Sequence, residues 1–369
     1  MAIPIANPRA QFAALKDEIS AAVQQVFESC QFILGPNVSE LENEVAAVCG
    51  ARYGIAVNSG TDAIVVALAA CGVGPGDEVI TTPFTFVATT EAVMIVGAKP
   101  VYVDIDPVTF NLDASGIEAA ITPRTKAILP VHLYGQCADI AKMELISRRH
   151  GLKLIADGAQ AIGALHKGKG IGAYGDAATL SFFPTKNLGG AGDGGMVLTN
   201  DEETAAACRS LRFHGMDSSY SYERVGYCSR LDELQAAVLK VKLAKLDEWN
   251  EARRSNAAFY MGQFADLPLS LPVSLPDNHH IYHQFTVGFA RRDELKARLG
   301  ERGIGSGVYY PSPLHLQRAY ACLGYEEGRF PRSERAARDV LSLPVFPELS
   351  ADDRAAVASA VREIVAELA

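Results

Sequence analysis

Leu152-Lys153-Leu154-Ile155-Ala156-Asp157 is an apolar run that ends in an acid, and Ser181-Phe182-Phe183-Pro184-Thr185-Lys186 is a second run that ends in an amine. Each begins with the length and composition of a buried β-strand. Ligands of open α/β sheets bind at the carboxyl ends of strands, so both end residues are placed to meet a ligand. Such a pair suits pyridoxal phosphate (PLP), because the amine can hold the aldehyde as a Schiff base while the acid keeps the ring nitrogen protonated. The alternative is a solvated surface lysine and an aspartate that caps a turn.

Further apolar runs flank these two and alternate with stretches long enough for helices. The expected strands cover residues 53–57, 78–81, 100–103, 127–130, 153–156, 178–182 and 195–199. This alternation predicts an α/β fold in which a mainly parallel, seven-stranded sheet is flanked by helices on both faces. A long helix is expected next, over residues 231–249.

The sequence changes character after that helix, and 369 residues are many for a single core. Residues 267–277 are rich in proline and leucine, and residues 282–289 resemble another strand. Ser350 and Asp353 form a capping-box-like start to a C-terminal helix. We therefore expect a large domain over residues 1–247 and a smaller α+β domain over residues 248–369.

Composition and charge argue against several classes of partner and location. The net charge of −9 and the pI near 5.5 disfavour binding to nucleic acid. No uninterrupted apolar run approaches ~18 residues, so no membrane span is expected, and the first residues lack the pattern of a signal peptide. The seven cysteines are scattered, which is typical of reduced thiols in a cytoplasmic protein.

Residues 57–63, Val-Asn-Ser-Gly-Thr-Asp-Ala, run from a strand into an apolar helix. Gly60 lets a ligand approach the backbone closely, and the free N–H groups of the first helical turn suit a phosphate. Ser59, Thr61 and, from the second apolar run, Ser181 add hydroxyl groups. The stretch therefore predicts the phosphate end of the site, although Ser59 or Thr61 could equally be a simple N-cap.

Two side chains are placed to contact the pyridine ring of the cofactor. Gln160 follows Asp157 by three residues and could hydrogen-bond the ring hydroxyl, while Phe86 follows another strand and offers a flat apolar surface. Beyond Lys186, residues 187–195 are rich in glycine. Such a stretch permits close packing around a cofactor or a neighbouring subunit, or forms a surface loop.

Taken in order, these motifs resemble the DegT/StrS group of nucleotide-sugar aminotransferases, which are fold-type I PLP enzymes. The resemblance rests on Asn-Ser-Gly-Thr-Asp-Ala (58–63), Thr-Phe-Val-Ala-Thr (85–89), Pro-Val-His-Leu-Tyr-Gly (130–135), Asp-Gly-Ala-Gln (157–160), Ser-Phe-Phe-Pro-Thr-Lys-Asn-Leu-Gly (181–189), Ser-Arg-Leu-Asp-Glu-Leu-Gln-Ala-Ala (229–237) and Tyr-Tyr-Pro-Ser-Pro-Leu-His-Leu-Gln (309–317). It implies that an amino group passes from L-glutamate, which leaves as 2-oxoglutarate, to a keto sugar carried on a nucleotide. It also implies a homodimer with shared active sites.

The resemblance assigns a role to each matching residue. It implies Lys186 as the Schiff-base lysine and proton shuttle, Asp157 at the ring nitrogen, Gln160 at the ring hydroxyl, Phe86 against the ring face, and Gly60, Thr61 and Ser181 at the phosphate. The segment around residue 228 normally reaches the partner subunit, where many relatives place an asparagine at the phosphate. This chain has Cys228 instead, which puts that contact in doubt because a thiol is a poor donor.

The substrate contacts are expected by analogy at Arg230, Tyr309, Tyr310 and His315. Arg230 could equally make a structural ion pair. The C-terminal motif and residues 279–284 look more like relatives that aminate C3 of a UDP- or dTDP-linked hexose than those that act at C4. Relatives that handle uronic acids tend to have histidine in place of Tyr309, which favours a neutral sugar here.

Three other functions compete with this interpretation. PLP-dependent sugar dehydratases of the same family have histidine where Lys186 stands, so the lysine favours transamination. A non-catalytic PLP-binding regulator is the alternative from a different class, and the presence of Lys186, Asp157 and Gln160 together argues against it. A metal site at His279-His280-x-x-His283 lacks a carboxylate cluster to complete it, so no metal is expected.

Overall fold

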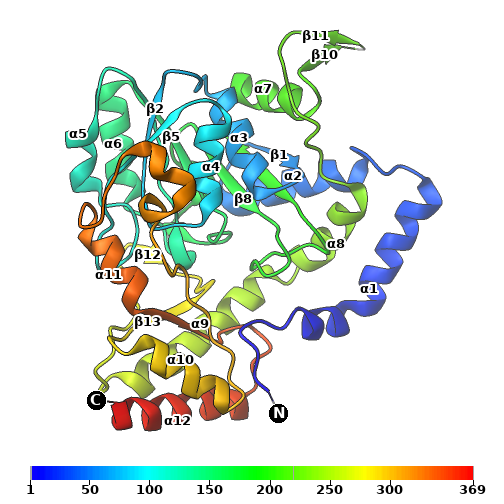
Figure 1. Cartoon of the computed structure of the whole chain (residues 1–369). Coiled ribbons are helices and arrows are strands. Elements are labelled where there is room, and N and C mark those ends of the chain that lie inside the picture. Colours follow the sequence, from blue (N-terminus) through cyan, green and yellow to red (C-terminus); the bar gives the residue numbers. More distant parts are fainter. Residues whose placement is uncertain (1, 219, 369) are drawn as a thin grey trace.

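The computed structural model describes residues 2–218 and 220–368, and a seven-stranded sheet lies at its centre (Figure 1). From one edge to the other, the strands are β1 (Tyr53–Val57), β9 (Gly195–Thr199), β8 (Ala177–Ser181), β5 (Lys153–Asp157), β4 (Thr125–Ile128), β2 (Glu78–Thr81) and β3 (Lys99–Tyr102). β9 runs antiparallel to both of its neighbours, and the other pairings are parallel. The predicted α/β fold with a mainly parallel sheet is therefore confirmed, and each expected strand lies within two residues of its predicted place.

The reversed direction of β9 follows from its connection to β8. Parallel neighbours need a long crossover, usually a helix, whereas antiparallel neighbours can be joined directly. Residues 182–194, between β8 and β9, hold most of the glycine-rich stretch and form no helix. The chain therefore returns beside the strand that it has just left.

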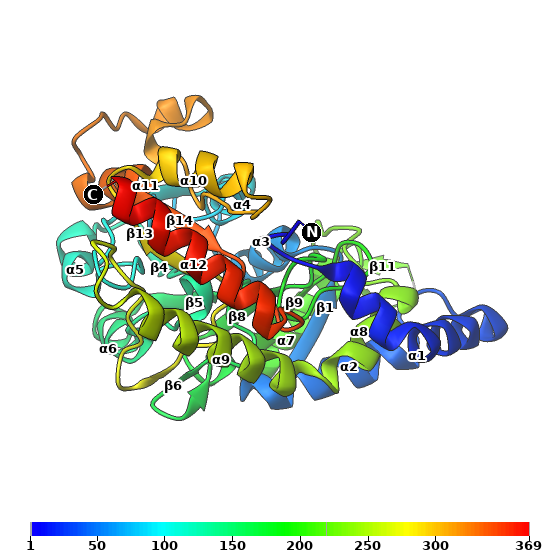
Figure 2. The same cartoon turned by 90° about the horizontal axis from the view of Figure 1, so that it is seen from below.

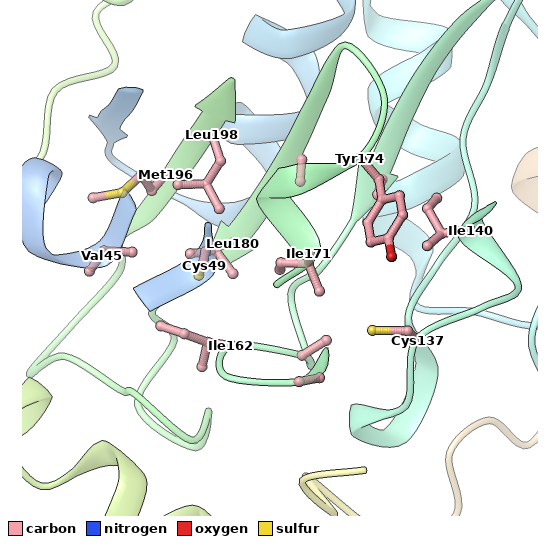
Figure 3. Close-up of a cluster of buried hydrophobic side chains, with 14 of the residues drawn as sticks. Val45, Cys49, Cys137, Ile140, Ile162, Ile171, Tyr174, Leu180, Met196 and Leu198 are labelled. Atoms are coloured by element: carbon pink, nitrogen blue, oxygen red, sulfur yellow. The ribbon is translucent and has the colours of Figure 1, made fainter. Parts of the chain in front are cut away.

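Helices cover both faces of this sheet. The helices of the described chain are α1 (Pro8–Ser29), α2 (Pro36–Cys49), α3 (Gly60–Ala70), α4 (Val87–Ile95), α5 (Ile117–Ala120), α6 (Ile140–His150), α7 (Glu202–Arg212), α8 (Glu233–Leu243), α9 (Leu246–Phe264), α10 (Arg292–Glu301), α11 (Pro331–Asp339) and α12 (Ala351–Leu368). On one face, α3, α4 and α7 pack against Ile55 and Ile155 of the strands. On the other face, α2, α6 and α8 pack against Leu154, Leu180 and Met196. Figure 3 shows Leu180 and Met196 in this cluster, together with Val45 of α2 and Ile140 of α6. Burial on both faces explains why the strands are continuous apolar runs.

The single helix expected over residues 231–249 is wrong, because the structure has two helices there. α8 ends at Leu243 and α9 begins at Leu246, with a bend at Ala244 and Lys245. The local sequence contains neither glycine nor proline to break a helix. Tertiary packing makes the bend instead, since α8 packs on α1 and α2 beside the sheet whereas α9 leaves the sheet and packs on α12.

A second hydrophobic core lies away from the sheet. It is built from α9, α10, α12 and the antiparallel pair β13 (Phe285–Gly288) and β14 (Val340–Leu343), with Tyr260 among its fully buried side chains (Figure 2). Ile3 also belongs to this core and pairs with Ile304, although the N-terminal segment was expected in the large domain. The boundary near residue 247 falls at the start of α9 and stays a prediction.

The C-terminal helix α12 begins as its sequence predicts. Ser350 Oγ accepts a hydrogen bond from the N–H of Asp353 at 3.0 Å and donates one to its carboxylate at 2.8 Å. The shorter strands form two small sheets: β6 (Leu165–His166), β7 (Lys169–Gly170) and β12 (Asn278–His279) make one, and β10 (Met216–Ser218) and β11 (Ser221–Tyr222) make the other. Within residues 2–218 and 220–368, no helix combines the length and hydropathy needed to cross a membrane.

Candidate active site

A cavity of about 600 Å³ lies at the carboxyl ends of β5 and β8. Ten of the residues singled out in the sequence line it: Ser59, Gly60, Thr61, Phe86, Asp157, Gln160, Ser181, Lys186, Tyr309 and Tyr310. Arg253, His283 and Gln284, from α9 and from the segment before β13, also line it. Motifs that are far apart in the sequence therefore meet at one place.

Strand geometry explains why Asp157 and Ser181 face the same way. Side chains alternate along a strand, and Ile155 and Ala177 pack on the face that α3 and α4 cover. Asp157 lies two residues beyond Ile155 and Ser181 lies four residues beyond Ala177, so both point to that same face. The two strands are parallel, with Asp157 paired to Thr179, which brings both side chains to one end of the sheet.

Asp157 is a buried carboxylate, with 4% of its surface exposed. One oxygen accepts a hydrogen bond from the hydroxyl of Thr89 at 2.8 Å, and the other accepts one from the N–H of Ala159 at 3.1 Å. Burial raises the pKa of Asp157, and these hydrogen bonds and the charge of Lys186 oppose that rise. A buried anion with neutral donors and one nearby cation is a fitting partner for a protonated ring nitrogen.

Lys186 is partly buried, with its side chain on the cavity. Burial lowers the pKa of its amine to about 8, and the negative charge of Asp157 limits the fall. An amine with a pKa near the working pH exists in appreciable amounts both with and without its extra proton. Lys186 is therefore suited to attack an aldehyde and to carry a proton.

The N-terminus of α3 forms a cradle for a phosphate. Ser59 is its N-cap, as the sequence left open, since its Oγ accepts a hydrogen bond from the N–H of Asp62 at 3.1 Å. The hydroxyl proton of Ser59 can still be donated, and the first N–H groups of a helix have no partner within that helix. A Cβ on Gly60 would lie 2.6 Å from the Cβ of Ser181. Only glycine fits there, so the backbone of α3 and the side chain of Ser181 meet at one small concave site that suits an anion.

Gln160 and Phe86 occupy the part of the cavity where a pyridine ring would lie. The side-chain oxygen of Gln160 accepts a hydrogen bond from the N–H of Tyr134 at 2.6 Å, and its nitrogen donates to the hydroxyl of Tyr310 at 3.2 Å. Phe86 is 54% exposed, and its ring centroid lies 6.1 Å from that of Tyr310. An aromatic ring left open in a cavity offers a surface for another ring to stack on.

Three expected contacts do not line the cavity of this chain: Cys228, Arg230 and His315. Cys228 is exposed, and Arg230 donates a hydrogen bond to its sulfur at 2.9 Å while the guanidinium lies over the ring of Phe213. His315 is buried, and its Nε2 lies 3.0 Å from a carboxylate oxygen of Glu334. The structure therefore gives His315 a position in the protein interior rather than at a substrate.

The sequence indicated no role for Thr89 or Asn187, and it left His283 as a metal ligand or as a solvated or substrate-facing histidine. Thr89 lies on α4, in the first turn after Phe86, and helical spacing could have placed it beside the site. His283 bonds through Nδ1 to Asn187, the residue after the lysine, at 2.9 Å. No local pattern signals this contact, because 96 residues separate its partners. Among the described residues, no three His, Cys, Asp or Glu side chains are grouped to hold a metal ion.

Comparison with known proteins places the chain in a family. The model of the DegT/DnrJ/EryC1/StrS aminotransferase family matches residues 13–362. The chain is 51% identical over 366 residues to the "Pleiotropic regulatory protein" of Geobacillus stearothermophilus, and the match covers 98% of each protein. It is 47% identical over 361 residues to the UDP-N-acetyl-3-dehydro-alpha-D-glucosamine 3-aminotransferase of Acidithiobacillus ferrooxidans, covering 98% of this chain and 97% of that protein.

A solved structure gives the same result for the fold. The crystal structure of S. venezuelae DesV in complex with a ketimine intermediate superposes with a TM-score of 0.97 at 46% identity, over 98% of each chain. The chain therefore belongs to the DegT/DnrJ/EryC1/StrS aminotransferase family.

Proposed function

We propose that this protein transfers an amino group from L-glutamate to a 3-keto hexose carried on a nucleotide. Its family makes it a PLP-dependent aminotransferase of nucleotide-linked keto sugars. The observation that carries the proposal is the meeting of Asp157 and Lys186 in one cavity, where the pKa of each responds to the charge of the other.

PLP supplies an aldehyde and an electron-withdrawing ring that stabilises negative charge on a substrate carbon. We assign the ring nitrogen to Asp157, which keeps it protonated because the carboxylate is buried and ionised beside it. Gln160 holds the ring hydroxyl, and Phe86 packs on the ring face. The phosphate lies against the cradle formed by the N-terminus of α3 and Ser181, where the helix dipole favours an anion.

Lys186 moves the protons in this scheme. Its Nζ would take the proton from the α-carbon of the amino donor and give it to the cofactor carbon that receives the amino group, and it would run the same transfer in reverse on the keto sugar. The pKa of about 8 allows both steps near neutral pH, because neither form of the amine is too stable to react. Histidine in this position would not attack an aldehyde, so a lysine supports transamination over dehydration.

The choice of C3 as the sugar carbon rests on a related protein and on the C-terminal motif, whose two tyrosines line the cavity. The Acidithiobacillus ferrooxidans protein, at 47% identity, is named as a 3-aminotransferase of a UDP-linked sugar. Tyr309 and Tyr310 line the cavity, so they are placed to contact the sugar as the motif analysis expected. Amination at C4 is the alternative within the same enzyme class.

We also propose that the active unit is a homodimer. Large apolar side chains are exposed on α1 and just after it: Phe12 is 49% exposed, Phe27 53%, Phe32 40% and Ile33 47%. α1 packs on α8 and lies at the edge of the molecule (Figure 1). Clusters of exposed apolar side chains of this kind favour an interface with another chain. The exposed segment with Cys228 and Arg230 would then complete the cavity of the partner.

A cytoplasmic location stays a prediction from the sequence.

One comparison favours a second function. The Geobacillus stearothermophilus protein, 51% identical, is named as a regulatory protein, which corresponds to the regulator that the sequence analysis weighed. A regulator would bind PLP without transferring amino groups. The residues at the cavity favour an enzyme, since a binding protein has no need of an amine tuned for proton transfer.

A single set of assays tests these proposals. Purified protein with PLP should show a change in cofactor absorbance when L-glutamate is added, and 2-oxoglutarate should appear. Mass spectrometry of the products from 3-keto and 4-keto sugars, on UDP and dTDP, then identifies the acceptor. Conversion of 4-keto sugars alone would overturn the choice of C3. PLP binding without amino transfer to any sugar would favour the regulator, and Lys186→Ala is the inactive control.

A further inference from the structure

A line of hydrogen bonds runs from the interior of the large domain to the loop that carries the lysine. Asn250 Nδ2 donates to the backbone carbonyl of Ile162 at 3.2 Å, and Asn187 Nδ2 donates to Asn250 Oδ1 at 2.7 Å. Asn187 Oδ1 lies 2.9 Å from His283 Nδ1. Asn187, Asn250 and His283 are all buried, at 3%, 4% and 9% exposure. The line joins the lysine loop, α9 and the segment before β13.

The carbonyl at one end sets the direction of every bond in this line. A carbonyl oxygen only accepts, so Asn250 must turn its NH2 group to Ile162 and its oxygen to Asn187. Asn187 must then turn its NH2 group to Asn250 and its oxygen to His283. His283 therefore carries its proton on Nδ1, and Nε2 is left as an acceptor. Gly163 makes room for the line, since a Cβ there would lie 2.7 Å from Asn250 Nδ2.

The environment of His283 keeps the imidazole neutral. Burial lowers the pKa of His283 well below its usual range, and the positive charges of Lys186 and Arg253 lower it further. The ring lines the same cavity as Lys186. Its Nδ1 is hydrogen-bonded to Asn187, the residue that follows the lysine, and the charge of Lys186 acts on the ring across the cavity that both side chains line.

We propose that Nε2 of His283 accepts a hydrogen bond from the amine of Lys186 and so orients the lysine for proton transfer. This inference deepens the proposed function and rests on it, because it concerns how Lys186 performs the assigned role. His283 is a positioning residue, since it acts through the lysine. A neutral acceptor suits this task, because an imidazolium would repel the ammonium form of the lysine and would have no free lone pair.

Two substitutions at His283 test the roles of the two ring nitrogens separately. His283→Asn keeps a donor near the position of Nδ1, so the bond to Asn187 can persist, but it removes the acceptor. His283→Gln can place an oxygen near the position of Nε2, but it loses the Nδ1 donor. His279→Asn is the matched control, because His279 is a nearby, half-buried histidine that does not line the cavity.

The first measurement does not depend on activity. Nitrogen-15 NMR of histidine-labelled protein, with the His283 signal identified by its loss in His283→Gln, reports which ring nitrogen carries the proton. We expect the Nδ1–H form, both without PLP and with it. A proton on Nε2, or a charged ring at neutral pH, would overturn the proposal. The protonation state is read in the wild-type protein, and the variant serves only to assign the signal.

The second measurement follows proton transfer directly. Single-turnover reaction of the PLP-loaded enzyme with L-glutamate should be about tenfold to a hundredfold slower in His283→Asn, because a misplaced reacting group costs rates of that order. The isotope effect of α-deuterated glutamate should rise, which a purely structural defect would not cause. His283→Gln should recover part of the rate, and His279→Asn should match the wild type. Unchanged rates and isotope effects in both His283 variants would refute the inference. If the wild-type enzyme failed to react with every amino donor tested, the proposed function itself would be refuted instead.

Discussion

Asp157→Asn tests the central charge of the site in two states of the protein. Without PLP, burial raises the pKa of Asp157, so its ionisation opposes folding. The sign follows from linkage: a carboxylate with a raised pKa in the folded state stabilises the fold at low pH, and this stability is lost as the pH rises through that pKa. Asparagine keeps an oxygen for the hydrogen bond from the N–H of Ala159, its NH2 group can donate to the hydroxyl oxygen of Thr89, and it has no charge to desolvate.

The expected effects on stability and on cofactor binding have opposite signs. The cofactor-free variant should be more stable at neutral pH by on the order of 1–3 kcal/mol, the usual penalty for a buried polar group that lacks a full set of partners. With PLP, the variant loses a charge-assisted hydrogen bond to the ring nitrogen that is worth about 1.5–3 kcal/mol. This loss corresponds to an affinity for PLP that is about tenfold to a hundredfold weaker.

Two assays measure these effects. Thermal unfolding of the cofactor-free proteins over a series of pH values compares stability. The advantage of the variant should grow as the pH rises through the raised pKa of Asp157 and then stay constant. Titration with PLP, followed by absorbance, compares affinity. A variant that is less stable without PLP and binds PLP as tightly as the wild type would refute the assignment of Asp157 to the ring nitrogen.

Three further predictions follow from other contacts. The rate at which the cofactor-free enzyme recaptures PLP should rise with pH and level off above about 8, because only the unprotonated amine of Lys186 attacks the aldehyde; a rate that still rises up to pH 10 in stopped-flow absorbance would contradict the lowered pKa. Gly60→Ala should weaken PLP binding at least tenfold, because its Cβ would meet Ser181 at 2.6 Å, whereas Gly262→Ala, in a helix with open space around it, should leave binding unchanged and add up to about 1 kcal/mol of stability in urea unfolding. Glu233→Gln should lower the free energy of unfolding by about 1.5–3 kcal/mol, because the carboxylate accepts three backbone N–H groups at the start of α2; turnover per folded molecule should stay the same, and an equal loss of turnover would show that this residue also supports the site.

The order and period of the apolar runs determined the fold class and most of the site. Strands buried on both faces appear in the sequence as continuous apolar segments. Asp157 ends one such strand, and the lysine follows another in the next loop, so both are visible in the sequence. The helix-start signal around Gly60 is local as well, because a glycine before an apolar helix is visible without a structure. The sequence was therefore sufficient to expect a PLP enzyme and to name many of the residues that line its cavity.

Only the tertiary structure revealed the features that depend on contacts between residues far apart in the sequence. The bend between α8 and α9 has no local cause, and His315 is turned toward Glu334 although its motif suggested a substrate contact. The bond between His283 and Asn187 joins residues 96 positions apart, and its direction is set by a carbonyl on a third segment. Periodicity reports only which face of its own element a residue lies on. Packing in three dimensions decides which side chains from other elements contact that residue. It therefore also decides the hydrogen bonds and charges that shift the residue's pKa.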